Sequence, residues 1–354
     1  MKMMNKRKWL YTTGAALAVV IMVGFFYRGA LASLGFDWFL QGHVEKKLEQ
    51  TYKPIEGREP VTTSTANKKQ DPFAVLLLGI DQRGKEIGRS DTMIYTVVRP
   101  NDGDLLMVSI PRDMYVEIVG KKSKNKQDKI THAYAFGGAG MSMDTVEKFL
   151  DAPIQYYATI NFEGFRQVID KLGGIKLPLE KDMVNKDPDH EKFVIKAGQD
   201  IYNGQDALNY VRYREDSDIN RTERHQIFLS LLMDKAKQMN QWSKIPDLID
   251  IMGENFSTNM RPDQLVDLGQ SIIQAKTRNI YSHSILGDGH RLTEGGTWYY
   301  FADEEDLAKV QTMIKSWLNA DISSSELILP DKYMENKTKE VKSLSLPQEQ
   351  SGQH

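Results

Sequence analysis

Four arginines lie close together in the stretch YVRYREDSDINRTERHQ, which covers residues 210–226. They are Arg212, Arg214, Arg221 and Arg224. A guanidinium group can grip a phosphate through two parallel hydrogen bonds, so this cluster predicts an anion site for a phosphate or pyrophosphate. The alternative is an ionic network within the stretch, because four acids are interleaved with the arginines: Glu215, Asp216, Asp218 and Glu223.

The second half of the stretch is predicted to open a helix. Asn220 followed by Glu223 is typical of an N-cap with a capping-box acid, which places Arg221 and Arg224 in the first turn. Free backbone amides and the positive end of the helix dipole lie there, and both favour an anion. Arg212 and Arg214 face the same side only if their own segment is extended or its helix ends there.

Two carboxylates lie at the ends of predicted strands. The apolar run FAVLLLGI (73–80) ends at Asp81, and GRSDTM presents Arg89 and Asp91 just before a second strand. Ligands of open α/β sheets gather at strand ends. An aspartate pair in a chain without cysteine suits a hard cation such as Mg²⁺, which keeps water ligands and shares phosphates. Turn capping and Arg–Asp pairing within the loop are the alternative.

A third strand carries another charged pair at its end. The turn RPNDGD, with its Asp-Gly pair, predicts a hairpin between strands 92–98 and 104–110. The third strand then runs parallel to the first, so Arg112 and Asp113 of VSIPRD share an edge with Asp81. A salt bridge between Arg112 and Asp81 is the simple structural interpretation of that proximity.

The elements that must position these residues alternate in type along the chain. A further strand is predicted at 154–160, and helices are predicted at 141–150, 162–172, 203–214, from about 220, at 262–275 and at 303–318. The helix at 203–214 could be capped by Asn203. Such alternation predicts an α/β fold, a three-layer α/β/α domain with a mixed central sheet.

The N-terminus predicts a membrane anchor. Residues 1–9 carry four positive charges, and 10–27 form an uncharged apolar run long enough to cross a bilayer as a transmembrane helix. The basic flank favours a cytoplasmic N-terminus, with the rest of the chain outside the cell membrane. A cleaved signal peptide ending at Ala32 is the alternative. We expect a stalk at 28–70, one catalytic domain at 71–330 and a disordered tail at 331–354.

Composition excludes several functions. The formal net charge is −2, and the positive N-terminus makes the remainder more acidic still, which is a poor footprint for nucleic-acid binding. The absence of cysteine excludes disulfides, thiolate metal sites and a cysteine nucleophile. Neither a Walker motif nor a G-x-S-x-G nucleophile elbow is present.

Several segments together resemble the LytR-CpsA-Psr family of Gram-positive cell-wall ligases, in particular its teichoic acid transferases. They are LLLGIDQRGKEIGRSDTM, VSIPRDMYV, KITHAYAFGG, FRQVIDKLGGI, IKAGQDIYNGQDALNYVRYRED and NRTERHQIFL, and they cover roughly residues 71–240. Their order and spacing make the resemblance specific. One departure is His225, where many relatives are expected to carry a second glutamine.

The resemblance implies a transferase that moves an anionic glycopolymer from an undecaprenyl-pyrophosphate carrier to a muramic acid hydroxyl of peptidoglycan. Asp81 and Asp91 would hold Mg²⁺ on the pyrophosphate, and one of Asp81, Asp91 and Asp113 would serve as the base. The groups around the phosphates would be Arg89, Arg112, Arg212, Arg214, Arg221, Arg224 and Gln226. A pyrophosphate-lipid receptor without catalysis and a lipid pyrophosphatase are the other functions that these residues allow.

Overall fold

The structure is a computed structural model of the chain. It describes residues 48–58, 71–81, 88–122, 124–186, 192–213 and 279–334, with single residues and short stretches between 224 and 268. The predicted membrane anchor at 10–27 and most of the predicted tail lie outside these residues. Within the described part of the chain, no helix combines the length and the apolar character needed to cross a bilayer.

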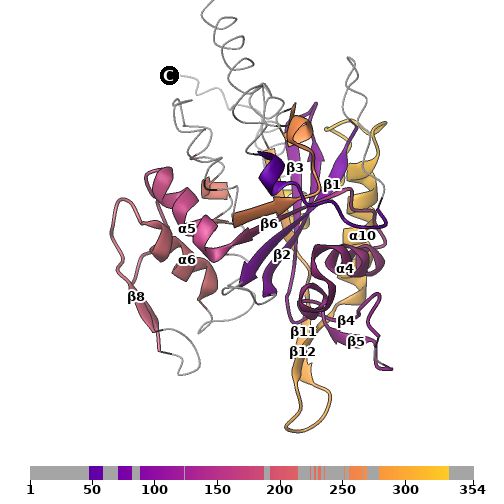
Figure 1. Ribbon diagram of the computed structural model, residues 1–354, viewed down its shortest axis with the longest axis horizontal. Helices are drawn as coiled ribbons and strands as arrows, with labels where there is room; N and C mark the ends of the chain where they lie inside the picture. The colour runs from indigo at the N-terminus through magenta and orange to yellow at the C-terminus, as the bar shows by residue number, and fades with distance from the viewer. Residues whose placement is uncertain are drawn as a thin grey trace, which may run out of the picture.

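Strands and helices alternate along the chain (Figure 1). The strands are β1 (Phe73–Asp81), β2 (Arg89–Arg99), β3 (Asp104–Ile110), β4 (Tyr115–Glu117), β5 (Gln127–Lys129), β6 (Tyr156–Asn161), β7 (Met183–Asn185), β8 (Phe193–Ile195), β9 (Phe256–Thr258), β10 (Asn279–Ser284), β11 (Gly287–Arg291) and β12 (Trp298–Ala302). The helices are the 3₁₀ turn η2 (Glu49–Thr51), α4 (His132–Leu150), α5 (Phe162–Lys171), α6 (Gly204–Arg212) and α10 (Glu304–Leu318).

The described strands build one central mixed sheet, in the order β10-β3-β2-β1-β6-β9. β2 is antiparallel to both β1 and β3, so β1 and β3 run parallel, as the Asp-Gly turn predicts. β6 and β10 run in the same direction, and β9 runs against it. The carboxyl ends of β1, β3, β6 and β10 therefore meet at one edge of the sheet, which we call the carboxyl edge.

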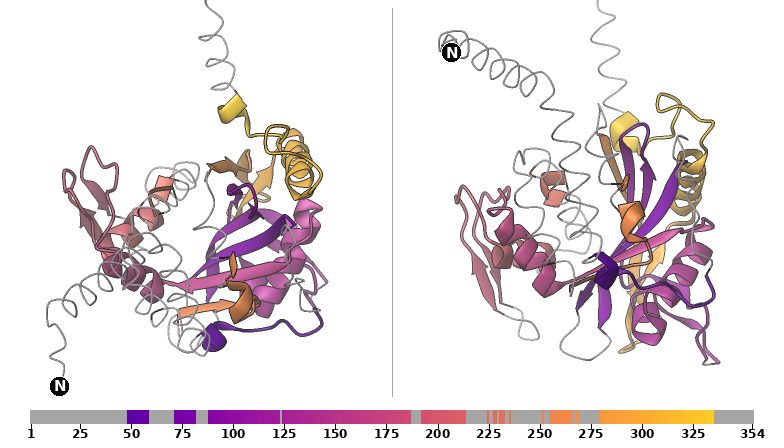
Figure 2. Two further views of the ribbon diagram at one scale, coloured as in Figure 1. Left: turned by 90° about the horizontal axis from the view of Figure 1, so that it is seen from above. Right: turned by 45° about the horizontal axis from the view of Figure 1, so that its top comes forward.

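One face of the sheet is closed by α4 and α10 (Figure 2). Strand residues Leu76, Tyr95 and Val108 point to this side and are fully buried against Val146 of α4 and Trp317 of α10. These side chains belong to the largest hydrophobic cluster of the molecule's described part. Apolar burial on this scale is the main stabilising contribution to the fold.

The opposite face carries α5 and α6, which pack closely on one another. The side chains of Asn161 and Asn203 cap the two helices by accepting hydrogen bonds from backbone amides of the first turns, and the cap at Asn203 confirms the sequence prediction. Gly204 allows the close approach, because a Cβ there would lie 2.2 Å from the carbonyl oxygen of Arg166. Helices thus flank the sheet on both sides.

Three short hairpins complete the described chain. Strands β4 and β5 pair, as do β7 and β8, and the sequence predicted neither of these hairpins. Strands β11 and β12 form the third hairpin, directly after β10 leaves the carboxyl edge. Figure 1 shows it extending beside β4 and β5.

The described part of the predicted stalk, residues 48–58, packs on the domain. The Lys53 amide donates to the Thr258 carbonyl oxygen over 2.7 Å, and Arg58 forms ion pairs with Asp144 and Glu147 of α4. At the other end, the start of the predicted tail forms a helical turn at 331–334, and the ring of Tyr333 contacts Tyr281 of β10.

Candidate active site

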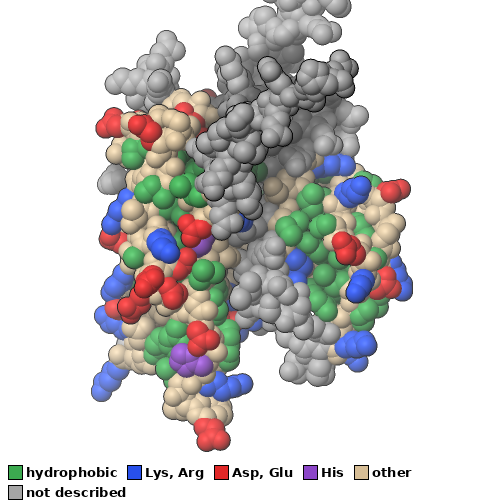
Figure 3. Space-filling model, turned by 180° about the vertical axis from the view of Figure 1, so that it is seen from behind, with side chains coloured by type: hydrophobic (Ala, Val, Ile, Leu, Met, Phe, Trp, Pro, Cys, Tyr) green, Lys and Arg blue, Asp and Glu red, His purple; other side chains and the backbone are tan. Residues whose placement is uncertain are grey.

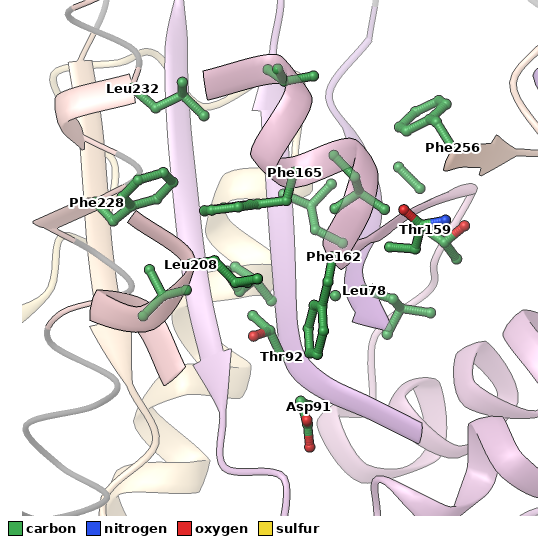
Figure 4. A pocket seen from close by; sticks show the side chains of 18 of the residues that line it. Leu78, Asp91, Thr92, Thr159, Phe162, Phe165, Leu208, Phe228, Leu232 and Phe256 are labelled. Carbon is green, nitrogen blue, oxygen red and sulfur yellow. The ribbon is translucent and has the colours of Figure 1, made fainter. Parts of the chain in front are cut away.

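A long apolar cavity of about 250 Å³ lies between the sheet and the α5–α6 pair (Figure 4). Its floor comes from the sheet residues that face away from α4 and α10, such as Leu77 and Ile94, and its wall includes Phe165. The charged residues in this lining are Asp91 and Arg212. Such a site fits an extended hydrocarbon chain whose polar end lies at the carboxyl edge.

Asp91 reaches this cavity because of a bulge in β2. The register passes from Gly79 opposite Thr92 to Ile80 opposite Ser90, which leaves Asp91 as the extra residue of the bulge. Successive strand residues ordinarily point to opposite faces, yet Asp91 and Thr92 both line the cavity. The bulge therefore turns the Asp91 carboxylate toward the cavity, a use of β-bulges that is frequent beside active sites.

Arg112 and Asp91 form an ion pair at the mouth of the cavity, with 2.6 Å between Arg112 Nη1 and Asp91 Oδ1. Arg112 Nε also lies 3.4 Å from Asp113 Oδ2, and Lys129 Nζ lies 2.7 Å from Asp113 Oδ1. Arg112 thus pairs with Asp91 at this edge, and the salt bridge to Asp81 that the sequence offered stays a prediction. Asp113 is buried and lies between these two cations.

The strand that holds Lys129 is fixed by a second charged residue, Asp128. Burial acts to raise the pKa of the Asp128 carboxyl, but hydrogen bonds from Lys121, the Lys129 amide and His132 hold this pKa below its usual range. Asp128 therefore stays ionised and ties β5 to the start of α4, where the Thr131 amide donates to the Arg112 carbonyl oxygen.

Asp81 and Arg89 face one another across β1 and β2 at the same edge, where they are register partners. Arg89 is exposed, and Asp81 is partly exposed. Among the described residues, no three Asp, Glu or His side chains gather in a group able to hold a metal ion alone. That Asp81 and Asp91 hold Mg²⁺ stays a prediction; two carboxylates are enough for this ion only where waters and phosphate oxygens complete its octahedral shell.

Arg212 lies where α6 ends, as one of the two sequence interpretations required. The next residue, Tyr213, is extended, and the Arg212 guanidinium lies 4.5 Å from the ring centre of Phe162 at the start of α5. This stacking holds a positive charge beside the α5 N-terminus, whose amides also favour an anion. Arg212 thus supplies the cationic end of the apolar cavity.

Arg224 is almost completely buried, with 6% of its surface exposed. Its Nε donates to the Tyr210 carbonyl oxygen over 3.1 Å, and its Nη2 donates to the Tyr213 carbonyl oxygen over 2.6 Å. These bonds satisfy carbonyls that the end of α6 leaves without helical partners. Arg224 therefore supports the segment that presents Arg212, and its predicted contact with phosphate stays a prediction.

Three predicted site residues, Arg214, Arg221 and Gln226, lie outside the described residues, as does His225. The structure adds two groups that the sequence reasoning did not identify. The first is Lys129, which is partnered with Asp113, and the second is the apolar cavity lining, including Phe162 and Phe165. The alternation of apolar residues along a strand indicates which face of the sheet each residue points to. It does not indicate whether helices fill that face or leave a cavity.

Known proteins resemble the chain over most of its length. The model of the LytR_cpsA_psr family matches residues 38–316. The polyisoprenyl-teichoic acid–peptidoglycan teichoic acid transferase TagU of Bacillus licheniformis is 32% identical over 321 residues, which are 90% of this chain and 98% of that protein. TagU of Bacillus subtilis is 32% identical over 305 residues, which cover 85% of this chain and 95% of that protein.

Solved structures give the same picture. A structure of TagT bound to LIIa-WTA is 30% identical to this chain, with a TM-score of 0.61, and the match covers 75% of this chain and 98% of that one. A crystal structure of B. subtilis TagV is 32% identical with a TM-score of 0.60, over 71% of this chain and 98% of the other.

Proposed function

Because the chain belongs to the LytR-CpsA-Psr family, we propose that it is a transferase that joins a teichoic acid type of glycopolymer to peptidoglycan. The observation that carries this proposal is an apolar cavity that ends at two charged residues, Asp91 and Arg212. A prenyl chain fills such a cavity, and its pyrophosphate then lies at the carboxyl edge beside Arg112.

The reaction that this arrangement supports is a phosphoryl transfer. A hydroxyl oxygen of the acceptor glycan attacks the phosphorus that bears the polymer, the bridging P–O bond breaks, and the prenyl monophosphate leaves. Arg112 and Arg212 neutralise charge on the phosphate oxygens, which is the main requirement of such a transition state. Asp81 and Asp91 would hold Mg²⁺, which supplies further charge neutralisation. The hydroxyl proton passes to a carboxylate, for which Asp81, Asp91 and Asp113 are the candidates at this edge.

The test uses the full chain in detergent with a prenyl-pyrophosphate-linked polymer and undecorated peptidoglycan. We expect covalent joining that EDTA abolishes. Asp91→Ala should lower the rate by roughly a hundred- to a thousandfold, the range for loss of one electrostatic group at a transition state. Asp321→Ala, which removes an exposed carboxylate far along the chain, is the matched control. Release of free polymer would instead indicate a pyrophosphatase, and binding without turnover would indicate a receptor.

We also propose that residues 10–27 anchor the protein in the cell membrane, with residues 1–9 in the cytoplasm and the domain outside. The uncharged run behind a basic start supports this orientation. Protease added to intact protoplasts should digest the domain and leave the first residues protected. A domain that stays intact, or that is found free in the medium after a cut at Ala32, would contradict the proposal.

A further inference from the structure

The hairpin β11–β12 presents an aromatic surface that the apolar cavity does not use. One side of the hairpin packs on the core through Trp298 and Tyr300. The other side carries Tyr299 and Phe301, which pack against Tyr115 of β4 with ring centres 4.7 and 5.3 Å apart. These three rings are half-buried.

His290 completes this surface. Its imidazole stacks on Phe301 with a centre separation of 4.2 Å and an interplanar angle of 15°. The side chain is 52% exposed although one of its faces covers Phe301, so the other face is turned to solvent. We call the set Tyr115, His290, Tyr299 and Phe301 the aromatic platform. On the face seen in Figure 3, hydrophobic side chains gather around a histidine toward the lower end of the molecule.

A continuous series of contacts connects the platform to the candidate active site. Lys129 Nζ lies 5.9 Å from the ring centre of Tyr299 and also forms the ion pair with Asp113. Asp113 contacts Arg112, and Arg112 contacts Asp91. The backbone adds a direct link, since the Tyr300 amide donates to the Asp113 carbonyl oxygen over 2.9 Å. The platform is thus adjacent to the charged residues of the candidate active site, with Lys129 in contact with both.

The platform and the apolar cavity belong to opposite faces of the sheet. β4 and the hairpin pack with the cluster that includes α4 and α10, whereas the cavity lies under α5 and α6. In a phosphoryl transfer, the attacking and leaving oxygens lie roughly in line on opposite sides of the phosphorus. If the prenyl phosphate leaves toward the cavity, the attacking hydroxyl has to arrive from the side on which the platform lies.

We propose that the aromatic platform binds a sugar ring of the acceptor glycan of peptidoglycan, and so orients the acceptor hydroxyl toward Asp91 and Arg112. This inference rests on the proposed transferase function. A pyranose ring has apolar C–H faces and a rim of hydroxyls, which match aromatic rings interspersed with hydrogen-bonding groups. Here those groups are the Tyr hydroxyls, His290 and the exposed Asp288. A carboxylate at this position disfavours an anionic lipid surface as the occupant.

The test measures binding of a fluorescent peptidoglycan tetrasaccharide to the full chain in detergent, with a prenyl pyrophosphate present. His290→Ala and Tyr299→Ala should each weaken tetrasaccharide binding by roughly two- to tenfold, the range for one aromatic contact. Tyr299→Phe should keep most of the affinity because the ring remains. Leu292→Ala is the matched control, since it alters an exposed residue that follows β11 outside the platform. The prenyl pyrophosphate should raise the melting temperature equally in all variants.

The possible outcomes separate this inference from the proposed function. Unchanged tetrasaccharide affinity in His290→Ala and Tyr299→Ala, with wild-type transfer intact, would overturn the platform and leave the transferase standing. The wild type could also bind the tetrasaccharide through the platform and yet show no transfer activity. That result would support the platform and contradict the proposed transferase function. Absence of tetrasaccharide binding in the wild type would overturn the inference, as would platform variants that lose only binding to phosphatidylglycerol vesicles.

Discussion

The two faces of the central sheet are formed by the same strands, but helices fill one face and leave a cavity on the other. On one face, Leu76 and Tyr95 are fully buried against α4 and α10. On the other face, their neighbours Leu77 and Ile94 line an open cavity. Both sets are hydrophobic, so residue type alone does not decide which face is filled. The difference comes from the helices, because α5 and α6 pack on one another around Ile169 and Ala207 and leave space above the strands.

The side chains on the two faces of the same strands therefore have different roles: one set stabilises the fold, and the other can bind a ligand. A filled face contributes the burial that holds the fold together, whereas an open face leaves hydrophobic surface that a ligand can cover. Substitutions on each face test this difference between the filled and the open side of the sheet.

The largest effect is expected on the filled face. Trp317→Ala removes a fully buried ring of α10 and should lower the free energy of unfolding by about 3–5 kcal/mol. Phe165→Ala, its counterpart on the open face, should cost only about 1–2 kcal/mol, because this half-buried ring already borders the cavity. Urea denaturation of the full chain in detergent measures both values. Equal costs would mean that the cavity is closed in solution.

An intermediate effect is expected from filling the open face. Ala158→Phe on β6 places a ring in the cavity and should weaken prenyl pyrophosphate binding roughly tenfold or more, because the lost tail contacts are each worth about 0.8 kcal/mol per methylene. Binding of inorganic pyrophosphate should not change. The matched control is Ala74→Phe on β1, which overpacks the filled face and should destabilise the fold by about 1–3 kcal/mol. Isothermal titration measures the affinity for both ligands. An equal loss of affinity for prenyl pyrophosphate and for inorganic pyrophosphate would contradict the assignment of the cavity as the site of the prenyl tail.

The smallest effect is expected at the charged end of the cavity. Arg212→Lys keeps the positive charge but loses the planar stack on Phe162 and the two-pronged fork, so pyrophosphate binding should weaken by about two- to tenfold. The rise in melting temperature caused by pyrophosphate should shrink accordingly, since a ligand stabilises the folded state in proportion to its binding. Arg291→Lys on the hairpin is the control. If pyrophosphate raises the melting temperature of both variants by the same amount, Arg212 does not contact the phosphate.

Much of the sheet could be predicted from local sequence. The apolar runs that became β1, β2 and β3 and the Asp-Gly turn between two of them gave the parallel relation that places Asp81 and Arg112 at one edge. The hairpin β11–β12 could not be predicted in this way, because Gly287 and Gly289 are unfavourable in strands. A Cβ at Gly289 would lie 2.0 Å from the Trp298 ring, so a contact across the hairpin requires the glycine.

The candidate site was harder to predict, because it depends on side-chain direction. The sequence offered Asp81 as a salt-bridge partner of Arg112 and did not reveal its ion pair with Asp91, since a bulge of one residue turns that carboxylate. Arg224 was counted with the phosphate ligands on the strength of its position in a first helical turn. Its side chain donates to the carbonyl oxygens of Tyr210 and Tyr213 at the end of α6, which the sequence does not reveal as acceptors.

The contacts of residues 48–58 also determine how far the enzyme can reach. If the proposed anchor ends at Tyr27, the linker to Leu48 is 21 residues long; we call this linker the leash. At roughly 3.3–3.6 Å per residue it spans at most about 70–75 Å. Lys53 and Arg58 fasten the end of this leash to the domain through Thr258 and α4. Detaching residues 49–58 from the domain would lengthen this connection by about ten residues, or roughly 35 Å. If residues 10–27 anchor the protein as proposed, the contacts of Lys53 and Arg58 therefore limit how far the domain can lie from the membrane.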